Sequence, residues 1–181
     1  GGFSTELIPV SLVEGEAEGA VLSCFENVRK NFEESGKTAI GRSEVSLSIY
    51  DDDRSLIVRS RETAIGNLCA DAFRYILDAD VAMINGGGIR ADIPIGEFTF
   101  NDIAKVFPYG NTACTAYITG KNIIDALEFS VMYLPVENGN FMQVSGLKFD
   151  VDTTEQAQIV FDDNGLFVSV ADGPRRISNV R

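Results

Sequence analysis

Three consecutive glycines at positions 86–88 are the first feature of this sequence that is suited to ligand chemistry. Without Cβ atoms, a turn lets backbone N–H groups approach a small molecule or anion closely, and positive φ angles become accessible. Asn85 precedes the glycines with an amide that can read a base edge, and Arg90 follows with a guanidinium that binds phosphate in bidentate fashion. The segment is typical either of a small-molecule cradle or of a tight turn that needs glycine for geometry alone.

Two further arginines, Arg59 and Arg61, stand at positions i and i+2 where the apolar run 56–58 ends. If that run is a strand, both side chains can face the same side, because side chains alternate along a strand. Several arginines near a glycine turn indicate recognition of phosphate or sugar phosphate. The alternative is ordinary surface ion pairing in an acidic protein.

Tyr109 lies in a Pro-Tyr-Gly turn, where an aromatic ring is easily presented to solvent. Such a ring could stack on a nucleobase. For a lone tyrosine, core packing or chance exposure is the more common explanation.

Histidine, the commonest general base and zinc ligand, is missing from the sequence. Its absence excludes a Ser-His or Cys-His nucleophilic system. Cys24, Cys69 and Cys114 are too far apart for a Cys-x-x-Cys site, so we predict buried small hydrophobes. The adjacent carboxylates 51–53 point different ways and are predicted to solvate a loop. We expect no catalytic residue and no metal site in this chain.

The charge balance excludes some classes of partner. With 15 basic and 27 acidic residues, the formal net charge is −12, which would repel a phosphate backbone. We therefore expect no nucleic-acid partner, and no membrane insertion because no apolar run approaches the roughly 20 residues of a spanning helix. A small anion remains possible where a few arginines line a cleft.

Hydrophobic periodicity predicts the elements that must position these residues. Helices are expected near 17–35, from Thr63 to 76, over 101–106 and over 120–131, and strands over 56–58, 81–84, 112–119 and 147–151. The Asn-Gly dipeptide at 164–165 predicts a hairpin between 159–161 and 166–170. We expect an α+β or α/β domain with a mixed sheet at 39–181, preceded by a lead-in and connector helix at 1–38.

Several motifs resemble the C-terminal domain of the family of 5′-nucleotidases, UDP-sugar hydrolases and 2′,3′-cyclic-nucleotide phosphodiesterases. They are Arg-Ser-Arg-Glu-Thr-Ala-Ile-Gly-Asn (59–67), Asn-Gly-Gly-Gly-Ile-Arg (85–90) and Phe-Pro-Tyr-Gly-Asn (107–111), in the family's order and approximate spacing. The segments 119–128 and 141–147 also resemble the family. The resemblance therefore covers the chain from about residue 40 to its end.

The resemblance implies a two-domain hydrolase that is secreted, periplasmic or on the cell surface. An N-terminal calcineurin-like domain would hold two divalent metal ions, such as Zn or Mn, and a His-containing catalytic dyad. The C-terminal domain would grip the nucleotide or nucleoside and rotate to carry the phosphate to those metals. The present chain, without its catalytic-domain partner, is expected to be inactive.

The resemblance also assigns roles to residues of this chain. Arg59, with Arg61 as a near competitor, and Arg90 would contact ribose or phosphate. Asn85 would hydrogen-bond the base.

Gly87 and Gly88 would let the backbone approach the ligand closely. Tyr109 would be one of the two aromatic rings that stack on the base, at a position where the family usually has Phe. The family's second clamp aromatic and its Gly-Gly-Asp segment would fall beyond residue 181, so a C-terminally truncated, weakly binding base site is expected. The alternative is a non-catalytic cell-surface interaction module that keeps the fold without its ligand.

Overall fold

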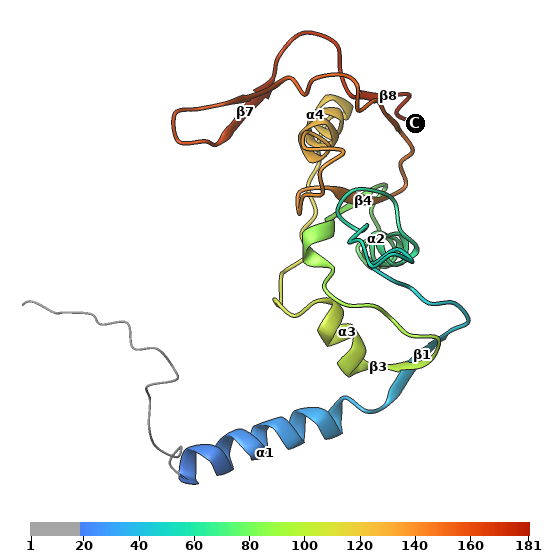
Figure 1. Cartoon of the computed structure of the whole chain (residues 1–181), viewed down its shortest axis with the longest axis vertical. Coiled ribbons are helices and arrows are strands. Elements are labelled where there is room, and N and C mark those ends of the chain that lie inside the picture. Colours follow the sequence, from blue (N-terminus) through green and yellow to red (C-terminus); the bar gives the residue numbers. More distant parts are fainter. Residues whose placement is uncertain (1–18) are drawn as a thin grey trace, which may run out of the picture. The chain divides into compact units, whose positions relative to one another are not determined.

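The computed structural model describes residues 19–181 (Figure 1). The expected lead-in before residue 19 lies outside the described residues. The chain divides into two compact units, residues 1–38 and residues 39–181. In the described part of the chain, every strand and the helices α2 (Ala64–Ile76), α3 (Phe100–Val106) and α4 (Gly120–Ser130) belong to the second unit.

Helix α1, Gly19–Ser35, belongs to the first unit. Its apolar residues recur at helical spacing, as the sequence predicts, and they form an exposed stripe. Exposed fractions of 45–65% are found for Val21, Leu22, Phe25 and Val28. Cys24 on the same helix is exposed too, so the prediction of burial is wrong for this cysteine.

Helix α2, Ala64–Ile76, begins where the sequence predicts it. The Thr63 hydroxyl accepts the N–H of Gly66 at 3.1 Å, which satisfies one of the free amides of the first helical turn. The buried face of the helix includes Ile65 and Cys69. Burial raises the pKa of the Cys69 thiol to about 12, because the thiolate would lose its hydration.

The strands pair into four two-stranded antiparallel sheets within the described residues. The pairs are β1 (Ala39–Ser43) with β3 (Gly96–Thr99), β2 (Ala82–Asn85) with β4 (Met142–Ser145), β5 (Asp150–Val151) with β8 (Ile177–Ser178), and β6 (Ile159–Phe161) with β7 (Phe167–Val170). The expected combination of helices and strands is confirmed, as is the Asn-Gly hairpin, in which Gly165 has φ +76°.

Two apolar clusters form the interior of the second unit. The first gathers buried residues from the region before α2, from α2 itself, from the segment after the glycines and from the end of α3: Leu47, Ile49, Val58, Ile65, Cys69, Ile89, Ile93 and Val106. The second gathers residues around helix α4 (Gly120–Ser130): Leu127, Val131, Leu134, Phe141 and Ile177. Side chains of the β2–β4 pair border both clusters, since Ile84 packs on the first while Met83 and Val144 pack on the second.

A buried carboxylate ties the C-terminal segment to α4. The side chain of Glu128 is fully buried and accepts the backbone N–H groups of Arg176 at 2.9 Å and Ile177 at 3.0 Å. In turn, the Arg176 guanidinium donates to the carbonyls of Val131 at 2.9 Å and Leu134 at 2.7 Å. Both buried charges are therefore hydrogen-bonded, as burial of a charge requires.

Two predicted strands are absent from the described structure. The run 56–58 contributes only an isolated bridge between Leu56 and Tyr50 before the chain turns at 58–60. The alternating run 112–119 belongs to no helix or strand, and its Cys114 is exposed rather than buried. Alternation predicts a strand only when a neighbouring strand supplies the hydrogen-bonding partners, which this segment lacks here.

Candidate functional site

The three glycines form a short 3₁₀ turn, Gly86–Gly88, directly after β2; we call it the glycine turn. The N–H of Gly86 donates to the carbonyl of Phe141 at 2.7 Å, and the N–H of Gly87 donates to the carbonyl of Gly139 at 3.1 Å. These two amides are therefore engaged by protein atoms rather than presented to a ligand.

Close backbone approach explains why these positions are glycine. A Cβ on Gly86 would lie 2.1 Å from the carbonyl oxygen of Val58, and a Cβ on Gly87 would lie 2.9 Å from the Cα of Gly139. None of the glycines in this turn has a positive φ. The turn thus needs glycine so that neighbouring backbone can pack against it.

Asn85 and Arg90 flank the glycine turn, and both are exposed. The Asn85 Nδ2 donates to the carbonyl of Gly139 at 3.4 Å. The Arg90 backbone N–H donates to the Val106 carbonyl at 2.9 Å, which fixes the main chain at the arginine. Its side chain turns back over the glycines, with Nη1 donating to the Gly87 carbonyl at 3.4 Å.

Tyr109 is brought to the same place by helix α3, Phe100–Val106. After α3, Phe107 packs edge-to-face against Phe73 of α2, with ring centroids 5.8 Å apart. The Tyr109 ring is 62% exposed, and the Arg90 Cζ lies 5.9 Å from its centroid. This distance is within the range of a cation–π contact, so two of the sequence motifs meet here.

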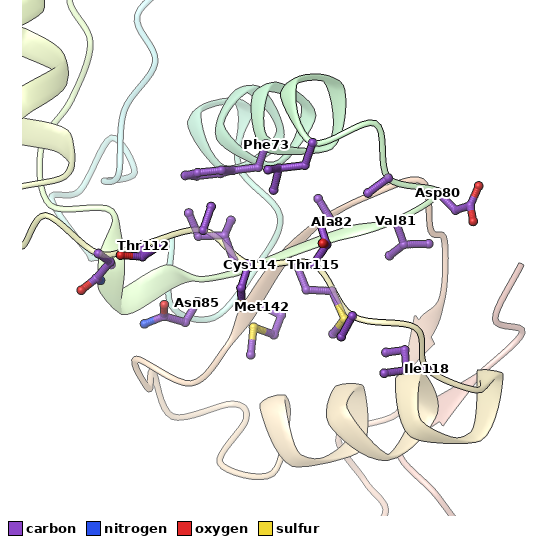
Figure 2. A pocket seen from close by; sticks show the side chains of 18 of the residues that line it. Phe73, Asp80, Val81, Ala82, Asn85, Thr112, Cys114, Thr115, Ile118 and Met142 are labelled. Carbon is purple, nitrogen blue, oxygen red and sulfur yellow. The ribbon is translucent and has the colours of Figure 1, made fainter.

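A cavity of about 1090 Å³ opens beside these residues (Figure 2). Asn85, Gly88 and Tyr109 line it, together with Phe73 from α2 and Met142 from β4. Figure 2 shows Phe73 reaching from α2, Asn85 at the end of β2, and Cys114 and Thr115 on the segment that closes the space. The wall combines apolar and aromatic surface with a few polar groups, as small-molecule sites commonly do.

Arg59 and Arg61 lie on a different segment, residues 57–61, which we call the arginine turn. Here the backbone turns instead of forming a strand, so the two side chains do not share a face by strand alternation. The Arg61 Nη2 forms an exposed ion pair with Asp51 Oδ2 at 3.1 Å. For Arg61, the alternative of surface ion pairing is therefore what the structure shows.

Arg59 is different, because its Nε is buried and has no hydrogen-bond partner among the described residues. A buried donor without a partner is costly, and this distinguishes Arg59 from the exposed, ion-paired Arg61. Among the described residues, neither Arg59 nor Arg61 belongs to the cavity wall.

The loop before β4, residues 138–141, contacts both the glycine turn and the arginine turn, and no motif in the sequence predicted these contacts. The N–H of Asn138 donates to the Arg59 carbonyl at 3.1 Å, while the Gly139 and Phe141 carbonyls accept from the glycine turn. The Asn138-Gly139 dipeptide is a turn signal that could have indicated a loop here. Its contacts with Arg59 and the glycine turn could not be found from spacing.

The residues that the structure describes do not fit a two-metal centre. The chain contains no histidine, and the described residues include no group of three Cys, Asp or Glu side chains that could hold a metal ion. Asp53 instead accepts hydrogen bonds from the Ser55 hydroxyl and N–H, and these bonds lower the pKa of its carboxyl. In the described part of the chain, no helix is long and apolar enough to cross a bilayer.

Comparison with known proteins gives consistent matches. Residues 39–181 match the family model described as 5′-nucleotidase, C-terminal domain. The trifunctional nucleotide phosphoesterase protein YfkN of Bacillus subtilis is 34% identical over 129 residues, which cover 69% of this chain and 8% of that protein. A 5′-nucleotidase of Vibrio parahaemolyticus is 28% identical over 131 residues, which cover 70% of this chain and 23% of that protein.

A solved structure shows the same fold. The 5′-nucleotidase precursor from Thermus thermophilus superimposes with a TM-score of 0.61 and 29% identity, over 87% of this chain and 31% of that one. The chain thus spans less than a third of each of these three relatives.

Proposed function

This chain belongs to the 5′-nucleotidase C-terminal domain family, and we propose that it recognises the nucleotide substrate of a phosphohydrolase whose catalytic residues lie outside the chain. Its relatives include 5′-nucleotidases, which are hydrolases, so the parent protein is a hydrolase in this proposal. The chain alone would not hydrolyse nucleotides, because it lacks both a histidine and a metal cluster in its described part.

The observation that carries the proposal is that Asn85 and Tyr109 line one cavity, while Arg90 lies beside it against the Tyr109 ring and the glycine turn. The Arg90 side chain lies between the glycine turn and the Tyr109 ring: its Nη1 is 3.4 Å from the Gly87 carbonyl oxygen, and its Cζ is 5.9 Å from the ring centroid. Each side chain can bind a different part of a nucleotide. The Arg90 guanidinium can bind phosphate or ribose, the Tyr109 ring can stack on the base, and the Asn85 amide can hydrogen-bond the base edge.

Arg59 adds a second cationic group. Its buried Nε has no partner among the described residues, whereas Arg61 is already paired with Asp51, and this favours Arg59. The net charge of −12 does not oppose this role, because the potential near a cationic group is set mainly by its close neighbours and not by the net charge of the chain.

The remaining parts of the proposal rest on the family. A separate calcineurin-like domain of the same polypeptide would hold two divalent metal ions and carry out the hydrolysis. The parent protein would work in the periplasm, outside the cell or at its surface.

A titration of the chain with AMP, UMP and adenosine, followed by NMR, tests the proposal. We expect localised shifts at Asn85, Arg90 and Tyr109 that are larger with the phosphate than without it. Arg90→Ala should weaken AMP binding by about 10- to 100-fold, the equivalent of roughly 1.5–3 kcal/mol for a charge-assisted hydrogen bond. Because Arg90 is exposed, the melting temperature should stay unchanged.

Arg42→Ala is the matched control. It removes the same charge from exposed strand β1 and should bind AMP like the parent chain. An equal loss of AMP affinity in Arg90→Ala and Arg42→Ala would mean that only the change in net charge matters, and not the position of Arg90. An absence of shifts in the parent chain at millimolar nucleotide would instead favour an interaction module that keeps the fold without binding nucleotide.

A further inference from the structure

Gln143, in the middle of β4, is a polar side chain that is only 1% exposed. A buried amide is tolerated only when its donors and acceptor find partners. Its Nε2 donates to the carbonyls of Val58 at 2.9 Å and Arg61 at 2.8 Å, and its Oε1 accepts the N–H of Thr63 at 3.2 Å. All three hydrogen bonds go to backbone atoms of the arginine turn or of the residue that caps α2.

The space for this amide is created by a glycine. A Cβ on Gly66 would lie 2.0 Å from the Gln143 Oε1. Alanine is otherwise favoured over glycine inside a helix, so the glycine in α2 has a packing reason. The motif that carries the arginines and the motif around Gln143 therefore form one structural unit, although the two ends of the contact are 80 or more residues apart.

The same strand and the loop before it also hold the glycine turn. The carbonyls of Phe141 and Gly139 accept from Gly86 and Gly87, while the Asn138 N–H reaches the Arg59 carbonyl. Residues 138–143 thus fix the glycine turn on one side and the arginine turn on the other. Gln143 makes the deepest of these contacts.

We propose that Gln143 is a positioning residue for nucleotide recognition: it sets the backbone of the arginine turn so that Arg59 is held at a fixed place relative to the glycine turn. This inference rests on the proposed function. Gln143 does not touch the nucleotide itself, and it acts through Arg59. Only a glutamine tip provides two N–H donors and one acceptor at this reach, since glutamate has no donor when ionised and methionine has none at all.

The test compares two near-isosteric variants with a matched core variant. Gln143→Met keeps the volume and removes the hydrogen bonds, and Gln143→Glu replaces the two donors by an acceptor that faces two carbonyls. Leu127→Ala destabilises the second cluster, which contains no residue of the arginine turn, and shows what a general loss of stability does.

The first measurement is hydrogen exchange without nucleotide. In both Gln143 variants, exchange should accelerate at the amides of Thr63 and Asn138, and it should stay slow at both in Leu127→Ala. The Asn138 amide is the informative one, because it donates to Arg59 rather than to Gln143.

The second measurement compares AMP with adenosine by NMR titration. The Gln143 variants should lose about tenfold in affinity for AMP, about 1.4 kcal/mol, and less for adenosine, because the displaced arginine serves phosphate or ribose. Leu127→Ala should retain the parent ratio of the two affinities. If the Gln143 variants do not fold, Gly66→Ala disturbs the same contact from the α2 side and carries the same two measurements.

Each outcome bears on a separate statement. Unchanged exchange at Asn138, or an equal loss of AMP and adenosine binding, would overturn the positioning role. If the parent chain shows no nucleotide-dependent shift, the proposed function fails, and Gln143 then has no nucleotide to position. The exchange measurement is made without nucleotide. It therefore shows whether Gln143 holds the arginine turn even if the chain proves not to bind nucleotides.

Discussion

The glycine turn and the segment 110–118 both border the cavity, yet the fold holds them very differently. Gly86 and Gly87 donate their amide hydrogens to the loop before β4, and Arg90 donates its own to Val106. Residues 110–118 belong to no helix or strand, and the Tyr117 side chain is completely exposed. One wall of the cavity is built from hydrogen-bonded backbone, whereas the other is a strip of extended chain.

This difference indicates how each wall would respond to change. Backbone packed to van der Waals contact has little room for an added atom, so substitutions in the glycine turn are costly. The extended segment can change its side chains at small cost and can adapt to a ligand. Between the two walls, the contact of Arg90 with Tyr109 contributes only about 0.5–1 kcal/mol, as expected of an exposed cation–π pair.

Gly86→Ala should have the largest effect on the glycine turn, which forms the hydrogen-bonded wall of the cavity. Its Cβ would lie 2.1 Å from the Val58 carbonyl oxygen, so backbone must move. We expect a loss of about 1–3 kcal/mol in the free energy of unfolding, measured by urea denaturation.

Gly120→Ala, just after the extended segment, is the control for that variant. A Cβ there would meet nothing within 4 Å, so its unfolding free energy should stay within about 0.5 kcal/mol of the parent value. Equal effects at the two glycines would contradict the contrast between the walls.

The pH dependence of stability should report on α3, which carries the Tyr109 turn. The Thr99 N–H, at 2.9 Å from the Asp102 carboxylate, and Lys105, at 3.0 Å, lower the pKa of Asp102 from 3.8 to about 2. Because the folded pKa is the lower one, the unfolded state binds the proton more tightly. The stabilisation is therefore complete above about pH 4 and is lost as the pH falls toward 2.

Asp102→Ala removes this helix-start hydrogen bond and should cost about 1 kcal/mol near pH 7. The cost should shrink when unfolding is measured near pH 2. A difference between variant and parent that does not change with pH would argue against the ion-linked hydrogen bond.

Cysteine labelling tests the exposure of the extended segment, with the buried face of α2 as the reference, and causes almost no change in stability. In a Cys24→Ser background, the exposed Cys114 of the extended segment should react with a thiol reagent at pH 8 at the rate of a free thiol. Cys69 should react only on unfolding, because it is buried and its pKa is about 12. Comparable protection of the two cysteines would show that the segment is covered.

Local chemistry explains which elements could be predicted. The Thr63 cap, the apolar period of α2 and the Asn-Gly turn depend on residues within a few positions of each other, and the structure agrees with all three. The strand expected at 112–119 depended on a partner strand, and this dependence is invisible in alternation alone. The burial of Glu128 was missed because its partners, Arg176 and Ile177, are almost 50 residues away.

The sequence by itself determined the residue types available to the site: Asn85, the three glycines, Arg90 and Tyr109, with no histidine for catalysis. Only the tertiary structure decided that the Gly86 and Gly87 amides serve the protein, and that Gln143 holds the arginine turn. It also separated Arg61, paired with Asp51, from Arg59, whose Nε is buried without a partner among the described residues. The physical reason is that a hydrogen bond is decided by which groups meet in space, and here the partners of the glycine turn and of Gln143 lie more than 50 residues apart in the chain.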